Sequence, residues 1–399
     1  MIYLDNNATT RVADEVIEAM APWYRDHYGN PHSAHALGRR AHDGIEQARA
    51  EVASLLRARP QEIVFTSCGT ESNAIAILGT LGQRPERRKI VTSAVEHPSV
   101  LALLGELSRR GEIELATVGV DGDGRLDLEA LRREVDSSTL LVTLMLAQNE
   151  TGVIHPVEDA ARIAAAAGAL LLVDAVQAAG KIETDAGALG ADLLSISGHK
   201  LHAPKGIGAL YVREGVTLSP IWRGGGQENG LRSGTEAVPL IAGLGCASRI
   251  AQQRLELQAN VRLLRDALEA RILAISATSR NGAEPRLPNT ASLSFHGLFA
   301  DSIVAELDAK GVCISAGAAC HSGAVEPSSV MKAMGKPIDQ ALGTVRFSLS
   351  RNTTAEEIEL AAALVEESVS HLRKGAAVAP RPEEGGGSTR SGRAASQAG

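Results

Sequence analysis

Lys200 and Asp174 have side chains that could bind and activate an aldehyde cofactor. Lys200 comes directly after an apolar run, in the sequence SISGHK. A lysine whose pKa is lowered by its surroundings can form a Schiff base with an aldehyde, although a solvated surface position is commoner for any single lysine. Asp174 ends the apolar run LLLVD, where it could cap a helix or pair with the protonated pyridine nitrogen of pyridoxal phosphate. Gln177 could then hydrogen-bond the phenolic oxygen of that ring.

A Gly-Thr pair opens a predicted helix and could bind a phosphate group. Gly69 and Thr70 follow the strand-like part of FTSCGTESN, and the first turn of a helix presents free N–H groups. The same pair could serve only as an ordinary helix cap. Ser197 and His199, from another loop, could complete the hydrogen bonds to the phosphate. His97 in SAVEHPSV could be structural, or it could stack on the ring and move protons.

Cys320 is the cysteine best suited to act as a nucleophile. It stands among small residues in GAACHSG, and we expect this aperiodic loop to be mobile and to deliver the thiol to a pocket. Cysteines are more often packing residues, and we predict that role for Cys68, Cys246 and Cys313. The chain has 4 cysteines, without a CxxC pair or a His/Cys cluster at zinc spacing. Neither a disulfide framework nor a metal site is therefore predicted.

Strands that alternate with helices must position these side chains. Apolar runs predict strands at residues 62–66, 89–92, 140–146, 170–174, 193–197 and 208–212. Helical periodicity predicts helices between most of them, at residues 34–56, 71–81, 98–109, 126–134 and 157–167. This alternation predicts an α/β fold with a mostly parallel sheet that is covered on both faces. In such a sheet ligands bind at the carboxyl ends of the strands, where the polar residues gather here.

A second, smaller domain is predicted beyond the sheet. We place a large cofactor-binding domain at residues 15–255, and a small α/β domain, which carries the Cys320 loop, at residues 1–14 and 256–374. The elements predicted for the small domain are a helix at 255–275, strands at 290–295 and 344–349, and helices at 301–310 and 355–373. Residues 375–399 are rich in Gly, Ser, Ala, Pro and Arg, and we predict that they are disordered.

The composition is that of an ordinary globular protein from a reducing compartment. Hydrophobic residues make up 44% of the 399 residues and charged residues 22%. The formal net charge of −7 argues against direct binding of nucleic acid through a basic face. We predict no signal peptide, because the N-terminus lacks a basic region followed by an apolar stretch, and no membrane-spanning run. A cytoplasmic location without membrane association is the resulting expectation.

The motifs, taken together, resemble those of the cysteine desulfurases of the NifS/IscS type, within the class V aminotransferase group of fold-type I pyridoxal-phosphate enzymes. The stretches that carry the resemblance, between about residues 3 and 354, are YLDNNATT, NPHSAHALGR, FTSCGTESN, SAVEHPSV, QNETGVIHPV, DAVQAAGK, SISGHKLHAPKGIGALYV, GGGQENGLRSGT, GAACHSGAVEPSSV and RFSLSRNTT. The resemblance implies a mostly parallel seven-stranded sheet, a smaller C-terminal domain and a homodimer. It also implies that L-cysteine is converted to L-alanine, with the sulfur held as a persulfide on Cys320 and passed to an acceptor protein such as an iron–sulfur scaffold.

The resemblance further implies a role for each candidate residue. Lys200 would hold pyridoxal 5'-phosphate covalently, Asp174 would pair with the ring nitrogen, and His97 would stack on the ring. Gln177 and Asn149 would contact the phenolic oxygen. The phosphate would be bound by Gly69, Thr70, Ser197 and His199 of the same chain, and Thr235 of the partner subunit would also reach it. Arg346 would clamp the substrate carboxylate, a bidentate contact that suits a guanidinium, with Asn149 nearby.

Three departures from the family pattern leave the substrate open. Gln148 replaces a usual Asn, Cys68 replaces a usual Gly, and AACHS around Cys320 replaces the commoner SACTS. A similar sequence around the reactive cysteine occurs in selenocysteine lyases, so a selenocysteine lyase is the main alternative. A class V aminotransferase without desulfuration is a second alternative, and the reactive cysteine argues against it. A non-catalytic scaffold protein is a third alternative. The presence of Lys200, Asp174, His97 and Cys320 argues against it, because a scaffold would not need these residues.

Overall fold

The computed structural model describes residues 1–378 except residues 85, 318, 322 and 323, and for residues 319–321, 324–325 and 376–378 it describes the backbone alone. Residues 375–378 continue the last helix, so the predicted tail begins at least four residues too early. The rest of the predicted disordered segment, residues 379–399, lies outside the described residues.

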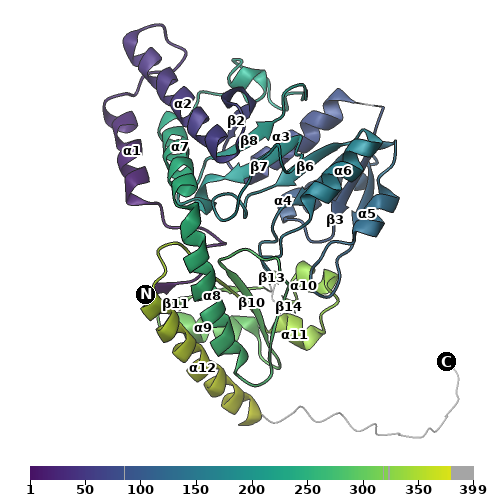
Figure 1. The fold of residues 1–399 in the computed structure, drawn as a ribbon, viewed down its shortest axis with the longest axis vertical. Coiled ribbons are helices and arrows are strands. Elements are labelled where there is room, and N and C mark those ends of the chain that lie inside the picture. Colours follow the sequence, from purple (N-terminus) through teal and green to yellow (C-terminus); the bar gives the residue numbers. More distant parts are fainter. Residues whose placement is uncertain (85, 318, 322–323, 379–399) are drawn as a thin grey trace, which may run out of the picture.

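A seven-stranded sheet forms the centre of the larger part of the molecule (Figure 1). Its strands are β2 (Ile63–Thr66), β3 (Lys89–Ser93), β4 (Glu114–Val118), β5 (Thr139–Met145), β6 (Leu170–Asp174), β7 (Leu193–Ser197) and β8 (Gly208–Val212). The strand order is β2-β8-β7-β6-β5-β3-β4, and β8 alone runs antiparallel to its neighbours. The predicted α/β fold with a mostly parallel seven-stranded sheet is thereby confirmed.

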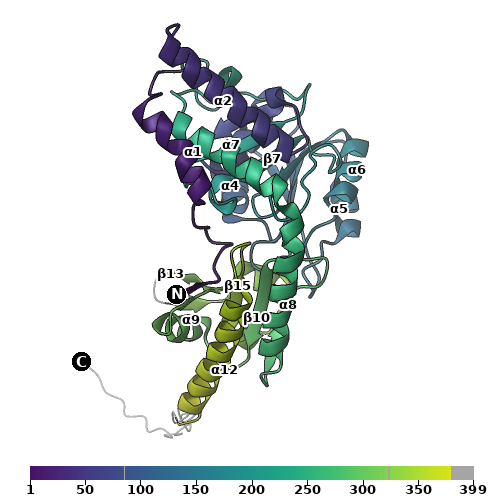
Figure 2. The ribbon, with the colours of Figure 1, turned by 60° about the vertical axis from the view of Figure 1, so that its left-hand side comes forward.

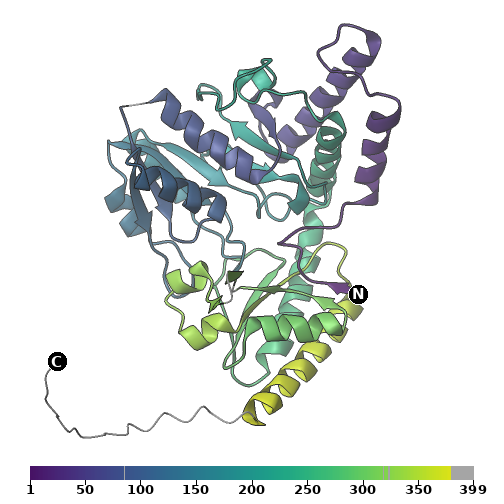
Figure 3. The ribbon, with the colours of Figure 1, turned by 180° about the vertical axis from the view of Figure 1, so that it is seen from behind.

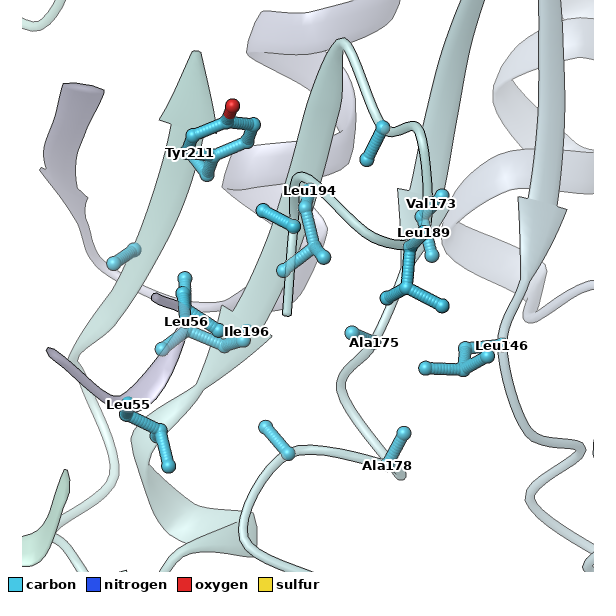
Figure 4. Packing of buried hydrophobic residues seen from close by; sticks show 14 of the residues in the cluster. Leu55, Leu56, Leu146, Val173, Ala175, Ala178, Leu189, Leu194, Ile196 and Tyr211 are labelled. Carbon is cyan, nitrogen blue, oxygen red and sulfur yellow. The ribbon is translucent and has the colours of Figure 1, made fainter. Parts of the chain in front are cut away.

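Helices cover both faces of this sheet because its strands are apolar on both sides. One face is covered by α3 (Gly69–Gln83) and α4 (Pro98–Arg109), and the other by α1 (Asp14–Arg25), α2 (Ala36–Leu55), α5 (Leu128–Glu134), α6 (Val157–Ala167) and α7 (Val238–Gln253). Alternate residues of a strand point to opposite faces, so Leu193 packs toward α3 while Leu194 and Ile196 pack toward α2. Figure 4 shows Leu194 and Ile196 close to Leu56, next to the end of α2.

Two helices of the large domain, α1 and α7, were not predicted, and glycines in α7 explain one of these omissions. Gly243 and Gly245 lower the helix propensity of α7. In the structure they allow neighbouring helices to approach closely: a Cβ added at Gly245 would lie 2.6 Å from the Cα of Ala48 in α2, and one at Gly243 would lie 2.8 Å from Sδ of Met20 in α1. These glycines therefore allow close packing between helices. The tertiary contacts that result stabilise α7 despite the low helix propensity of glycine.

The smaller part of the molecule has its own sheet and core. Its main elements are α8 (Gln258–Leu273), β9 (Thr278–Arg280), β10 (Thr290–Phe295), α9 (Ala300–Ala309), β11 (Val312–Cys313), β12 (Ser315–Ala316), β13 (Ala319–His321), β14 (Ala324–Glu326), α10 (Ser329–Ala333), α11 (Ile338–Leu342), β15 (Thr344–Ser348) and α12 (Ala355–Val378). The antiparallel sheet has the order β12-β15-β10-β9, and α8 leads into it from the large domain (Figure 2). Leu268, Phe295 and Phe347 are fully buried in the core beneath it.

The N-terminal segment belongs to the small domain by its contacts and then reaches the large one. Strand β1 (Ile2–Tyr3) pairs in parallel with β11, and Leu4 is fully buried in the small core. Figure 3 shows this segment, in purple, lying against the green and yellow small domain near the label N. Its continuation carries Asn7 and Ala8 to the carboxyl ends of the large sheet. Within the described part of the chain, no helix is both long enough and apolar enough to cross a membrane.

Candidate active site

The carboxyl ends of five strands of the large sheet surround a pocket of about 260 Å³. The order in which strands are added to the sheet reverses here. Strand β4 lies on one side of β3, at the edge of the sheet, and β5, which follows β4 in the sequence, lies on the other side of β3. Such a switch point opens a crevice between loops that turn opposite ways. The predicted residues that line the pocket are Gly69, Thr70, His97, Asn149, Asp174, Gln177, Ser197, His199 and Lys200. These side chains therefore lie together at the carboxyl ends of the strands, as their positions in the sequence predicted.

Lys200 presents its amine to this pocket from the short turn after β7. Its Nζ donates hydrogen bonds to the backbone carbonyls of Asn7 and Ala8, the latter at 2.8 Å. Burial lowers the pKa of Lys200 to about 8, and the positive charge of Arg346 acts in the same direction, against the smaller effects of Asp5 and Asp174. A pKa near 8 leaves part of the amine neutral at physiological pH. A neutral amine is the form that can attack an aldehyde.

Asp174 lies at the end of β6, the strand next to β7, and is 5% exposed. Its Oδ2 accepts a hydrogen bond from Nδ2 of Asn73 at 2.9 Å, and its Oδ1 accepts one from the backbone N–H of Val176 at 3.0 Å. The chain that follows is a series of turns and not a helix, so Asp174 is not an α-helix N-cap. Both donors are neutral, so they fix the carboxylate without cancelling its charge, and a cationic ligand group would do so.

His97 caps α4 and is held by Ser99. The backbone N–H of Ser99 donates to Nδ1 of His97 at 3.1 Å, and the Ser99 hydroxyl lies 2.9 Å from the same atom. Burial lowers the pKa of His97, and Lys200 lowers it further while Asp174 opposes the shift. The imidazole is therefore neutral at pH 7. Because Nδ1 accepts from a backbone N–H, the proton of the neutral ring is on Nε2.

The start of α3 has the features of an anion-binding turn. Cys68, at the N-cap, makes no side-chain hydrogen bond to the helix, so the first N–H groups of α3 remain available. The hydroxyl of Ser197 is buried and has no hydrogen-bond partner among the residues that the structure describes. A Cβ at Gly69 would lie 2.7 Å from the side chain of Val176, so glycine lets the start of α3 pack closely against Val176. Burial lowers the pKa of His199 to about 4, which leaves that ring neutral.

Sequence analysis did not single out three polar residues at this site: Asn73 lines the pocket, and Asn7 and Lys181 lie behind it. Gln177 donates from Nε2 to the carbonyl of Asn7 at 2.9 Å, and its Oε1 accepts from Nζ of Lys181 at 2.8 Å. Lys181 also donates to Oδ1 of Asn7 at 3.2 Å. Burial, followed by the charges of Lys200 and Arg346, lowers the pKa of Lys181 well below its usual value. Only their positions within the motifs DNNATT, GTESN and QAAGK could have indicated them.

The other predicted residues lie outside this pocket. Arg346, on β15, donates to the carbonyl of Asn149 at 3.0 Å and to Oδ1 of Asp5 at 2.8 Å, so it borders the pocket through Asn149. Thr235 is exposed and does not line the pocket of its own chain. Cys320 lies in β13, which forms an antiparallel hairpin with β14, where we had expected an irregular loop. Its side chain lies outside the described part of the structure.

The remaining cysteines correct one prediction. We expected Cys68, Cys246 and Cys313 to be core residues, but each is only half-buried. Cys68 lines the pocket at the start of α3, and Cys246, on α7, lines a separate pocket with Trp23. Cys313 is on β11, where it pairs with Tyr3 of β1. Cys68 follows the end of a strand, and Cys246 packs against the edge of the large core, so neither is fully enclosed.

Comparison with known proteins decides the family. Residues 2–360 match the aminotransferase class-V family. The chain belongs to this family. Among class V relatives, "Cysteine desulfurase" of Trichormus azollae is 46% identical over 377 residues, which is 94% of this chain and 94% of that protein. "Cysteine desulfurase NifS" of Azotobacter vinelandii is 46% identical over 93% of both chains. A solved structure named "NIFS-like protein" has a TM-score of 0.87 at 39% identity, and covers 93% of this chain and 99% of its own.

These findings confirm the predicted resemblance to the NifS type of class V aminotransferases. The likeness covers both the large domain and the small domain, because the family match runs from residue 2 to residue 360. It therefore includes the segment with Asn7, the strand ends with Asp174 and Lys200, and the hairpin with Cys320. The family assignment does not by itself give a role to any one of these side chains.

Proposed function

We propose that this protein is a cysteine desulfurase, which uses pyridoxal 5'-phosphate to convert L-cysteine to L-alanine and keeps the sulfur as a persulfide on Cys320. The observation that carries the proposal is the placement of Lys200 and Asp174 at neighbouring strand ends in one pocket. The cysteine desulfurase names of relatives at 46% identity over nearly the whole chain support the reaction. They also favour cysteine over selenocysteine as the substrate.

The residues of the pocket fit the cofactor at each of its polar groups. The buried carboxylate of Asp174, held only by neutral donors, suits a protonated ring nitrogen. The free hydroxyl of Ser197 and the uncapped start of α3 at Gly69 suit the phosphate. The partly neutral amine of Lys200 suits the aldehyde. When bound, the cofactor supplies an electron-withdrawing ring that no amino-acid side chain provides.

In the proposed reaction Lys200 is the base, and His97 is a hydrogen-bond donor. Lys200 takes the proton from Cα of the substrate on its Nζ, a role for which a pKa of about 8 is suited. His97 carries its proton on Nε2, because Nδ1 accepts the hydrogen bond of Ser99 N. It therefore donates a hydrogen bond in the reaction, and accepting a proton would require it to give up the contact with Ser99.

Cys320 performs the sulfur transfer as a thiolate, since the thiol form is a poor nucleophile. Its sulfur attacks the sulfur of the substrate, so that an S–S bond forms and the C–S bond breaks. The electron pair of the broken bond stays with the substrate carbon, which takes up a proton to become the methyl group of alanine. The persulfide then passes its outer sulfur to an acceptor protein, such as an iron–sulfur scaffold.

A homodimer is part of the proposal. Thr235 is exposed and away from the pocket of its own chain, which suits a contact with the pocket of a second subunit. Arg346 holds Asp5 and the carbonyl of Asn149, and we propose that it exchanges the Asp5 contact for the substrate carboxylate. In the structure Arg346 makes one hydrogen bond to Asp5, whereas a guanidinium can make two to a substrate carboxylate that takes its place.

The deciding experiment is a test for the cofactor and its attachment. The purified protein, incubated with pyridoxal 5'-phosphate and passed through gel filtration, should be yellow, and borohydride should abolish the colour and fix the cofactor on Lys200. A colourless protein that retains no cofactor would refute the proposal. With the cofactor bound, comparison of kcat/KM for cysteine and selenocysteine on one preparation tests the choice of substrate.

A further inference from the structure

An ion pair joins the loop at residues 223–236, here called the glycine-rich loop, to the first turn of α3. Arg232 donates from Nε to Oε1 of Glu71 at 2.9 Å. The other carboxylate oxygen of Glu71 accepts a hydrogen bond from the backbone N–H of Ser67. The side chains of Glu71 and Arg232 are 8% and 29% exposed. Glu71 therefore connects the loop with the turn at residues 67–70, which is the proposed phosphate site.

Glu71 places a negative charge beside the site proposed for another anion. It is the third residue of α3, in the same turn as Gly69 and Thr70. Burial alone would raise the pKa of Glu71, but the hydrogen bonds from Arg232 and Ser67 outweigh burial and lower it, so the carboxylate is charged. A carboxylate at a helix start stabilises the helix, but it repels a phosphate that approaches the same end. The charge of Glu71 has to be balanced before a phosphate can bind well.

Hydrogen bonds on both sides of Arg232 anchor the glycine-rich loop and so hold this arginine beside Glu71. Glu228 of the loop receives two hydrogen bonds of 2.8 Å from the guanidinium of Arg49, and its side chain is 3% exposed. The backbone N–H of Gly234 donates to the side chain of Gln227 at 3.0 Å, which closes the loop around Arg232. Anchors on both sides of Arg232 limit its movement. Arg232 itself does not line the pocket.

We propose that Arg232 is a positioning residue for the phosphate group of the cofactor, because it neutralises Glu71 and so allows the turn at residues 67–70 to bind an anion. The inference rests on the proposed function, since it assumes that pyridoxal 5'-phosphate occupies the pocket. It assigns a task to an arginine that touches neither the ring nor the substrate. Its test has to separate the phosphate from the rest of the cofactor.

The experiment compares two ligands that differ only in the phosphate. The cofactor-free protein is titrated with pyridoxal 5'-phosphate and, separately, with pyridoxal, and each dissociation constant is measured from protein fluorescence. In Arg232→Met, Glu71 keeps its charge but loses its partner. We expect the dissociation constant for pyridoxal 5'-phosphate to rise roughly tenfold to hundredfold. The constant for pyridoxal should change by less than about twofold, because this ligand brings no second anion to the turn.

Further variants separate charge from folding. The double variant Glu71→Gln with Arg232→Met has no unbalanced charge and should regain most of the affinity for the phosphate form. Arg232→Lys keeps the positive charge and should retain most of the preference for the phosphate form, and it carries the comparison if Arg232→Met does not fold. Arg57→Met is the matched control, because Arg57 pairs with Glu183 at an exposed site and its loss should change neither constant.

Three results would overturn the inference while leaving the proposed function intact. An equal loss of affinity for both ligands in Arg232→Met would mean that the arginine serves the fold. Unchanged affinity for pyridoxal 5'-phosphate, or a double variant that binds it no better than Arg232→Met, would mean that the charge of Glu71 is not felt at the phosphate. A wild-type protein that binds neither ligand would instead overturn the proposed function, and the inference with it.

Discussion

Asn73 donates a hydrogen bond from Nδ2 to Oδ2 of Asp174 at 2.9 Å, and so connects α3 with the end of β6. The same helix begins at Gly69, in the proposed phosphate turn. One rigid element therefore sets both the position of the anion site and the orientation of the buried carboxylate. The distance between the two polar ends of the pocket is fixed by α3.

This relationship predicts the effect of Asn73→Leu. The variant removes a hydrogen bond to a buried charged group, which costs about 1–3 kcal/mol in the state where that group is needed. We expect weaker binding of pyridoxal 5'-phosphate and of pyridoxal, by similar factors of about tenfold, because the contact serves the ring. Fluorescence titration measures both. Gln83→Ala, at the exposed far end of α3, is the control, and equal affinities for Asn73→Leu and wild type would contradict the proposed role.

Cys320→Ala should separate cofactor binding from sulfur transfer. We expect the variant to bind pyridoxal 5'-phosphate and to absorb visible light as the wild type does, since the cofactor contacts proposed above come from other residues. Desulfuration, measured as alanine and sulfide released from L-cysteine in the presence of a thiol, should be abolished. Cys246→Ala, in a separate surface groove, should keep its activity. Release of sulfide at the normal rate by Cys320→Ala would show that another group is the nucleophile.

Lys200 should make the cofactor-free protein less stable below pH 8. Its pKa is lowered from 10.5 to about 8 in the folded protein, chiefly by burial. Between these pH values the unfolded chain binds more protons, so this contribution to stability rises with pH and is lost as the pH falls through 8. Lys200→Met should therefore be more stable than wild type at pH 7, by up to about 3 kcal/mol. Urea unfolding should show the difference shrinking toward pH 10, and a pH-independent difference would contradict this prediction.

Glu96 should make the stability of the folded protein change with pH in the opposite direction to Lys200. This fully buried carboxyl accepts a hydrogen bond from Ser93, and burial raises its pKa to about 8. Between the ordinary value of 4.5 and about 8 the folded protein binds more protons, so the contribution of Glu96 to stability falls as the pH rises through this window. Glu96→Gln resembles the protonated form. Urea unfolding should therefore show the variant gaining stability relative to wild type from pH 5 to pH 8.5, and parallel pH curves would exclude a buried neutral acid.

The sheet was predictable because its strands are short apolar runs between helices. Strand β6 and strand β7 were predicted with the bounds that the structure shows, because they are buried on both faces. The edge strand β4 was missed, because its sequence ELATV is largely exposed and has no apolar run. Helix α7 was missed because its glycines, which serve close packing, weaken the helical pattern.

The positions of the candidate residues around the pocket were predictable only where a side chain has chemistry of its own. Lys200, Asp174 and His97 could be found from residue type and position at strand ends. Asn7 could not, because its importance comes from contacts far along the chain: its backbone N–H donates to Ser348, and its side chain accepts from Lys181. An amide near the N-terminus reveals nothing of this in isolation.

The contacts of Asn7 constrain the order in which the protein can be completed during synthesis. Domains generally form as the chain leaves the ribosome, from the N-terminus onward. Asn7 is made early, yet it bonds with Ser348, which is 341 positions later. The amine of Lys200 hydrogen-bonds to the carbonyl oxygens of Asn7 and Ala8. We expect the large sheet to assemble on the ribosome with an open pocket, which closes around the lysine only after the last strand of the small sheet has emerged.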